Sequence, residues 1–177
     1  GFSKEISGEN ISYNSAFQDY ATVALLTRNT DGNKTIEWET ASVPKVVKGE
    51  YVYFGWVAGH STGTSSGDRN FDLYVDGKKV LTFTTVPKNK NPNWVFKAED
   101  GSALAFQQTK LDGANDSQGY AFLRLPVSKV KAGQAVHIKI VGQKQNSNDW
   151  FMTFKFAFEE NVKIVPTPFL LKNGTQS

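Results

Sequence analysis

The stretch FDLYVDGKKVLTFTT, residues 71–85, decides the fold class that this chain is expected to adopt. From Phe71 to Val75, apolar residues alternate with more polar ones, which is the period of a half-buried β-strand. Asp76-Gly77 then predicts a tight turn, because glycine accepts the positive φ that such turns require. The strand pattern resumes after the turn, so the stretch predicts an antiparallel hairpin.

The same signals recur along the whole chain and helix signals are nearly absent. In residues 51–58, both the odd and the even positions are mostly apolar, which predicts a central strand covered on both faces. Ile36 and Trp38 are expected to face inward, with Glu37 and Glu39 facing outward. About nine to ten strands must close their edges, and an all-β, antiparallel β-sandwich of the jelly-roll or a related type is the common solution. The expected strands are 21–27, 35–43, 51–59, 71–76, 80–85, 94–98, 103–108, 119–125, 135–142 and 150–158.

Composition limits the possible classes of protein. The chain has 177 residues, no cysteine and a formal charge of +3, which excludes disulfides and cysteine-based metal sites. Its positive charges are dispersed, so no nucleic-acid partner is expected, and no apolar run is long enough for membrane insertion. Residues 1–20 lack a signal-peptide pattern and are expected to form an edge strand or a wrapping arm. We expect one domain over residues 1–163 and a C-terminal linker toward a further domain over residues 164–177.

Long polar segments and tight turns alternate along the predicted strands. If successive strands reverse direction, all the long segments fall at one end of the sandwich and the short turns at the other. Binding residues are concentrated on such loops. The long segments are 28–34, 60–70, 86–93, 109–118 and 143–149, and the short turns are 76–79, 99–102 and 131–134.

Amides, carboxylates and cations gather in these long segments beside tryptophan, and this combination suits a sugar. Planar groups hydrogen-bond hydroxyl pairs, while the apolar face of a pyranose stacks on an indole. Trp150 shares its parity with Met152, which predicts that it caps the core, with Phe151 on the opposite face. Trp94 is therefore the preferred stacking residue. The predicted ligand-binding residues are His60, Arg69, Lys88, Lys90, Asn91, Trp94, Asp112, Asn115, Asn146, Asn148 and Trp150.

Calcium is the one cofactor for which the sequence offers ligands. Asp112, Asn115 and Asp116 supply the oxygens that Ca²⁺ prefers, but their spacing fits a polar turn equally well. We therefore expect either a structural calcium ion at these residues or an ordinary polar turn.

Two groups of residues would suit an enzyme rather than this binding role. Glu37 and Glu39 have the separation of an inverting glycosidase pair, although outward glutamates more commonly form a solvated face. A jelly-roll polysaccharide lyase or hydrolase would have to use His137 with Tyr120 or Arg124. A third alternative is a structural spacer domain without ligand, which a large exposed apolar patch would favour.

Four stretches carry a resemblance to a known family: TIEWETA (residues 35–41), FDLYVDGKK (71–79), GYAFLRLP (119–126) and DWFMTFK (149–155). They resemble the galactose-binding-like β-sandwich modules appended to secreted bacterial polysaccharide-degrading enzymes. The resemblance implies a non-catalytic carbohydrate-binding module, secreted or at the cell surface or periplasm of a bacterium. Its partners would be a polysaccharide or oligosaccharide, acidic or sulfated given the basic charge, and a catalytic domain in the same chain. In such families sugars bind on loops at one end and calcium, when present, is structural.

Overall fold

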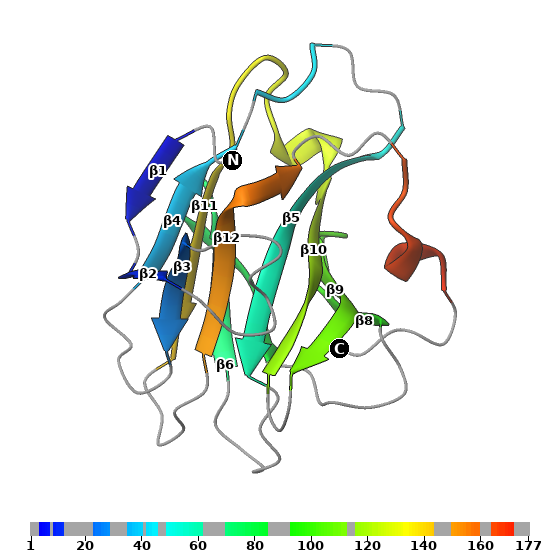
Figure 1. The fold of residues 1–177 in the computed structure, drawn as a ribbon. Coiled ribbons are helices and arrows are strands. Elements are labelled where there is room, and N and C mark those ends of the chain that lie inside the picture. Colours follow the sequence, from blue (N-terminus) through cyan, green and yellow to red (C-terminus); the bar gives the residue numbers. More distant parts are fainter. Residues whose placement is uncertain are drawn as a thin grey trace.

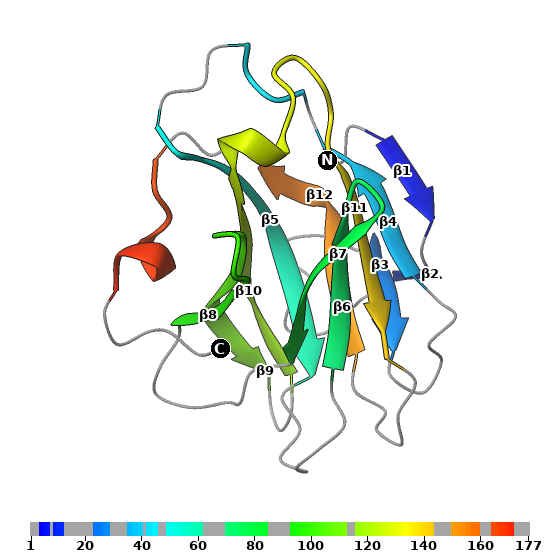
Figure 2. The same cartoon turned by 180° about the vertical axis from the view of Figure 1, so that it is seen from behind.

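The computed structural model describes residues 4–7, 9–12, 23–28, 35–40, 42–45, 49–61, 70–84, 93–112, 116–143, 150–159 and 164–171. Within these ranges the chain forms two antiparallel sheets that pack face to face as a β-sandwich (Figures 1 and 2). The strands are β1 (Lys4–Ser7), β2 (Glu9–Ser12), β3 (Val23–Arg28), β4 (Thr35–Glu39), β5 (Tyr51–Ser61), β6 (Asn70–Val75), β7 (Lys78–Thr84), β8 (Asn93–Lys97), β9 (Ala103–Asp112), β10 (Asp116–Pro126), β11 (His137–Gly142) and β12 (Trp150–Glu159). Two short 3₁₀-helices, η1 (Val127–Lys129) and η2 (Thr167–Leu170), complete the described elements.

The strand order identifies the sandwich as a jelly roll. The five-stranded sheet has the order β1-β4-β11-β6-β7, and the seven-stranded sheet has the order β2-β3-β12-β5-β10-β9-β8. Removing β1 and β2 at the edges and the β8–β9 pair leaves β4-β11-β6-β7 facing β3-β12-β5-β10. This interleaving of early and late strands is the eight-stranded double Greek key. The all-β antiparallel prediction is confirmed, and all ten predicted strands are present.

The N-terminal segment contributes one short strand to each sheet. β1 pairs with β4 at the edge of the five-stranded sheet, and β2 pairs with β3 at the edge of the seven-stranded sheet. The edge-strand alternative for this part of the chain is therefore the correct one for the residues described.

The core lies between the sheets and is rich in aromatic residues. The ring of Phe83 contacts Phe71, Phe96, Phe106 and Phe151 at centroid distances of 5.4 to 6.3 Å. Such ring pairs add to the gain from burying their apolar area. Because these phenylalanines come from both sheets, the cluster locks the two layers together.

The predicted faces are mostly observed. Alternate residues of β4 and β6 are buried, and β5 is buried on both faces over its second half, as a central strand between β12 and β10 should be. The β6–β7 turn has φ of 49° at Asp76 and 83° at Gly77. Positive φ at both central residues is the hairpin geometry that matches strand twist.

Candidate functional site

The two ends of the sandwich differ in the way the sequence predicted. We call the end where β3, β5, β7, β9 and β11 finish the loop end, and the opposite end, which carries the turns at 76–77, 99–102 and 131–134, the turn end. In Figure 2 the arrowheads of β3, β5 and β11 all point to the loop end. The strand ends that precede the long polar segments thus lie at the same end of the molecule.

The predicted ligand residues are only partly within the described structure. Side chains are described for His60, Trp94 and Trp150, and the backbone is described for Asp112. The others lie outside the described residues: Arg69, Lys88, Lys90, Asn91, Asn115, Asn146 and Asn148.

His60 lies in the sheet rather than in a surface loop, which corrects the expected start of the segment 60–70. β5 continues through Ser61 because His60 and Ser61 pair with Ser117 and Asp116 of β10. The His60 side chain is 3% exposed, packs near Phe106 with ring centroids 5.7 Å apart, and its Nδ1 lies 2.9 Å from the carbonyl oxygen of Ser61. Because His60 is almost fully buried, a ligand could contact it only by entering the sandwich at the loop end.

The two candidate tryptophans do not lie as predicted, since the sequence predicted that Trp150 caps the core and that Trp94 is the stacking residue. Phe151 belongs to the core between the sheets, so Trp150 lies on the opposite, outer side of β12. Trp94 is partly buried and packs against the same core as Phe96. The parity prediction for β12 was wrong because Phe151 and Met152 are both fully buried there, so the apolar pattern does not distinguish the faces.

A bulge in the pairing of β9 and β10 lies near the loop end. Gln118 pairs with Lys110 but Gly119 pairs with Gln108, so one residue of β9 is left over. The strands approach so closely here that a Cβ on Gly119 would overlap the carbonyl oxygen of Gln107. Only glycine fits this position, because a strand interior that tolerates no side chain marks a close backbone approach.

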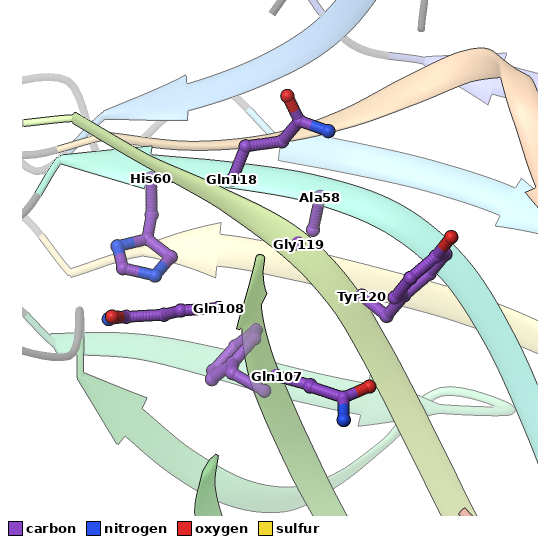
Figure 3. Close-up of a pocket in the computed structure, with 8 residues that line it drawn as sticks. Ala58, His60, Gln107, Gln108, Gln118, Gly119 and Tyr120 are labelled. Atoms are coloured by element: carbon purple, nitrogen blue, oxygen red, sulfur yellow. The ribbon is translucent and has the colours of Figure 1, made fainter. Parts of the chain in front are cut away.

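A small hollow adjoins the bulge, as Figure 3 shows. Its volume is about 10 Å³, at the lower limit for one water molecule. His60 and Gln108 lie on one side of β10, while Gln118 and Tyr120 lie on the other (Figure 3). The lining residues are Ala58, His60, Phe106, Gln107, Gln108, Gln118, Gly119 and Tyr120.

Gln118 belongs to the predicted polar segment 109–118, but the structure places it within β10 and buries its side chain, which the sequence did not predict. It is 1% exposed, and within the described part of the chain neither its amide nitrogen nor its amide oxygen has a hydrogen-bond partner. An unsatisfied buried polar group costs about 1–3 kcal/mol and calls for an explanation. No local signal reveals it, because a glutamine on the polar parity of a strand normally predicts a solvated side chain.

The candidate calcium ligands are only partly placed. The backbones of Asp112 and Asp116 lie directly opposite each other in the β9–β10 pairing, while Asn115 is outside the described residues. Among the described residues, no group of three or more His, Asp or Glu side chains could hold a metal ion. The calcium site stays a prediction.

The outer face of the five-stranded sheet carries the residues considered for catalysis. His137 Nε2 lies 2.9 Å from Glu37 Oε2, and Thr35 donates to Glu37 Oε1 at 3.3 Å. Arg124 belongs instead to the seven-stranded sheet, where it lies over Tyr51 and Phe169 and donates from Nε to Gly101 O at 2.9 Å. The expected grouping of His137 with Arg124 or Tyr120 is therefore wrong, because the sandwich separates them.

The start of the predicted exit linker packs on the outer face of the seven-stranded sheet. Phe169 of η2 lies 5.6 Å from the Tyr53 ring and contacts the buried cluster of Val95, Ala103 and Ala105. Burial raises the pKa of the Tyr53 phenol despite the opposing charge of Arg124. This part of residues 164–177 is docked on the domain.

Comparison with known proteins returned no matching family model, no matching curated protein and no matching solved structure. Across the described ranges, no helix has the length and apolar character needed to cross a bilayer. The fold class consequently rests on strand order, and the function on the chemistry of the site.

Proposed function

We propose that this chain is a non-catalytic carbohydrate-binding module that binds a polysaccharide at the loop end of the sandwich. The single observation that carries the proposal is the shared location of the strand ends that precede its long polar segments. Binding residues are commonly carried by connecting segments that a rigid scaffold positions. The module would hold a catalytic domain of the same chain near its polymer, outside a bacterial cell.

The distribution of buried polar residues supports the loop end as the binding end. His60, Ser61, Asn93 and Gln118 are all at most 8% exposed and lie in the half of the seven-stranded sheet nearest that end. Burying polar groups costs free energy unless their bonds are made. Gln118 differs from His60 and Ser61, because Ser61 Oγ accepts a hydrogen bond from Trp150 N at 3.0 Å and His60 Nδ1 lies 2.9 Å from Ser61 O, whereas the Gln118 amide has no hydrogen-bond partner among the described residues. The Gln118 amide is thus the group of this set that supports a polar ligand near the loop end.

The enzyme alternative has lost the constellation that motivated it. His137 is bonded to Glu37 on one sheet, and Tyr120 and Arg124 belong to the other. A lyase site needs its base within hydrogen-bond reach of the substrate proton and of its partner groups. The separation of these residues by the sandwich core therefore favours binding over catalysis.

An acidic or sulfated glycan is the preferred ligand because the chain carries a formal charge of +3 and an isoelectric point near 9.0. The anionic groups would be contacted by Arg69, Lys88 and Lys90, which belong to the long polar segments of the sequence. Such contacts weaken as salt screens the charges. Neutral glycan binding would show little dependence on salt.

Affinity electrophoresis followed by isothermal titration calorimetry tests the proposal. The panel contains xylan and galactomannan as neutral polymers, alginate and pectin as uronates, and carrageenan as a sulfated polymer, each at low and high salt. We expect retardation by at least one anionic polymer, reduced at high salt. Absence of binding to every polymer would overturn the carbohydrate-binding role, and salt-independent binding would overturn the anionic preference.

A spacer domain is the second candidate, and exposed apolar residues around η2 favour it. Ile164 is 76% exposed and Leu170 is 67% exposed, with Val165 and Leu171 beside them. Exposed apolar patches mark contact surfaces. If the panel shows no binding, a contact between this surface and a neighbouring domain becomes the better account of the chain.

A further inference from the structure

Trp150 differs from the other tryptophans of this chain in the side of the sheet on which it lies. Trp38 and Trp56 belong to the core between the sheets, and Trp94 packs against that core. Trp150, by contrast, lies on the outer side of β12, where it is partly exposed. A partly exposed indole on an outer face can stack on the apolar face of a sugar, which a tryptophan of the core cannot do.

The backbone of Trp150 is held on both sides at the loop end. Trp150 is the first residue of β12, and it pairs with Arg28, the last residue of β3, so that β3 ends beside the start of β12 (Figure 1). On the other side, Trp150 N donates to Ser61 Oγ at 3.0 Å, and Ser61 is the last residue of β5. Because Ser61 is buried, water competes little for this hydrogen bond. The indole is thus attached to a fixed part of the sheet, which reduces the entropy lost when a ligand binds.

A cationic residue belongs to the same cross-strand pair. Residues that pair directly across two antiparallel strands lie on the same face of the sheet, with their Cβ atoms about 4.5–5.5 Å apart. The pairing of Trp150 with Arg28 therefore places position 28 next to the indole on the outer face. Arginine presents a planar fork of N–H donors that matches the oxygens of an anionic group. An indole beside an arginine suits a pyranose that carries an acidic group.

We propose that Trp150 and Arg28 form a subsite for an acidic sugar residue on the outer face of the seven-stranded sheet, at the loop end. The pyranose ring stacks on the Trp150 indole, and its carboxylate or sulfate accepts hydrogen bonds from Arg28. Ser61 is a positioning residue, because its hydroxyl holds the N–H of Trp150. The inference rests on the proposed function and deepens it, because it names the residues that select an acidic sugar and assigns the stacking role to Trp150 in place of Trp94.

The first test removes the stacking ring from the whole 177-residue chain. Isothermal titration uses alginate and polygalacturonate as uronates and carrageenan as the sulfated polymer, which distinguishes the two sources of the anion. Trp150→Ala should lower the association constant for the polymer bound most tightly about tenfold, or about 1.4 kcal/mol, and Trp150→Phe should lower it less. Tyr120→Ala is the matched control and should bind as the wild type does. Tyr120 is an exposed aromatic residue of the same sheet, but β5 lies between its strand and β12.

The second test removes the cation. Arg28→Gln should lower the association constant several-fold at low salt, and the difference from the wild type should shrink at high salt because salt screens the charges. Arg28→Lys keeps the charge without the planar fork and should give an intermediate value. Lys139→Gln removes an equal charge from the other sheet, where Lys139 lies over Tyr74, and should leave binding unchanged. Fully methyl-esterified polygalacturonate keeps the sugar ring without the charge and should bind more weakly than the free acid form.

The third test concerns the positioning role of Ser61. Ser61→Ala leaves Trp150 N without its acceptor, so the association constant should fall, whereas Ser61→Thr keeps a hydroxyl and should restore binding. Binding is measured well below the unfolding midpoint of every variant, where a loss of stability alone does not change the association constant. Ser61→Ala and Arg28→Gln also keep the proposal testable if Trp150→Ala fails to fold.

The outcomes distinguish this inference from the proposed function. A wild-type chain that binds an acidic polymer while Trp150→Ala and Arg28→Gln bind it equally well overturns the subsite and leaves the loop-end module standing. Equal binding of the free acid and methyl-esterified polymers by the wild type overturns the choice of an acidic sugar. A wild-type chain that binds no polymer of the panel overturns both proposals. A loss of binding in Tyr120→Ala as large as that in Trp150→Ala also counts against the subsite.

Discussion

Two buried polar side chains at opposite ends of this sandwich, Thr40 and Gln118, are satisfied to different degrees. At the turn end, the buried hydroxyl of Thr40 accepts a hydrogen bond from Val136 N at 3.0 Å, and Thr40 N donates to Val136 O at 2.9 Å. Near the loop end, the buried amide of Gln118 makes no hydrogen bond to any residue that the structure describes. The same domain thus satisfies one buried group in full and leaves another unmet. The Thr40 hydroxyl should therefore contribute to the stability of the sandwich, whereas the Gln118 amide should contribute little to it.

The largest expected effect distinguishes the glycines of the two ends. Gly119→Ala places a methyl group against the carbonyl oxygen of Gln107, so the β9–β10 backbone must shift, and we expect a loss of about 3 kcal/mol in unfolding free energy, the upper end of the usual cost of overpacking. Gly77→Ala at the turn end meets no atom within 4 Å but keeps a φ of 83°, which costs an L-residue roughly 1–2 kcal/mol. Urea unfolding measures both. A larger loss for Gly77→Ala would contradict the close approach at the bulge.

The second prediction compares the two buried polar side chains directly. Thr40→Val preserves shape but leaves the buried Val136 N–H without its acceptor, which should cost about 1–3 kcal/mol. Gln118→Leu removes a group that has no bond to lose, so its unfolding free energy should equal or exceed that of the wild type. Equal destabilisation by the two substitutions, measured by urea unfolding under identical conditions, would remove the contrast between the ends.

Much of the fold was predictable because its signals are local. The alternation of β4 and β6 and the glycine at position 77 each depend on a few neighbouring residues, and each is found as expected. The jelly-roll order also follows, since strands that reverse in succession leave few ways to close two sheets.

The site was less predictable because it depends on distant pairing. His60 was assigned to a loop since its sequence neighbours are polar, yet β10 and β12 extend the strand through it. The prediction placed Trp150 on the wrong side of β12, because Phe151 and Met152 are equally buried and the apolar pattern does not distinguish the two sides. The burial of Gln118 depends on its three-dimensional surroundings, which no periodicity encodes.

The smallest expected effect concerns Asp72, on the outer face of the five-stranded sheet. Its Oδ1 accepts hydrogen bonds from Thr82 at 2.7 Å and Gln143 at 2.9 Å, and Lys79 Nζ lies 3.3 Å away. Partial burial acts to raise the pKa of Asp72, but the hydrogen bonds and the charge of Lys79 outweigh it, so the pKa lies below its ordinary value. This polar group near the loop end is therefore satisfied, in contrast to Gln118 on the other sheet.

Because the folded-state pKa of Asp72 is depressed, its contribution to stability is present above the unfolded-state pKa, near 3.8, and is lost as the pH falls through the folded-state value. Asp72→Asn should remove this part of the acid-induced loss of stability and flatten the profile of unfolding free energy below about pH 4. The change should stay under about 1 kcal/mol, since Lys79 is half exposed and exposed ion pairs contribute little. Lys79→Ala, as a control, should weaken the pH dependence by less than Asp72→Asn does. A profile for Asp72→Asn as steep as that of the wild type would show that this carboxylate does not contribute to acid sensitivity, and the contrast with Gln118 would then rest on hydrogen-bond geometry alone.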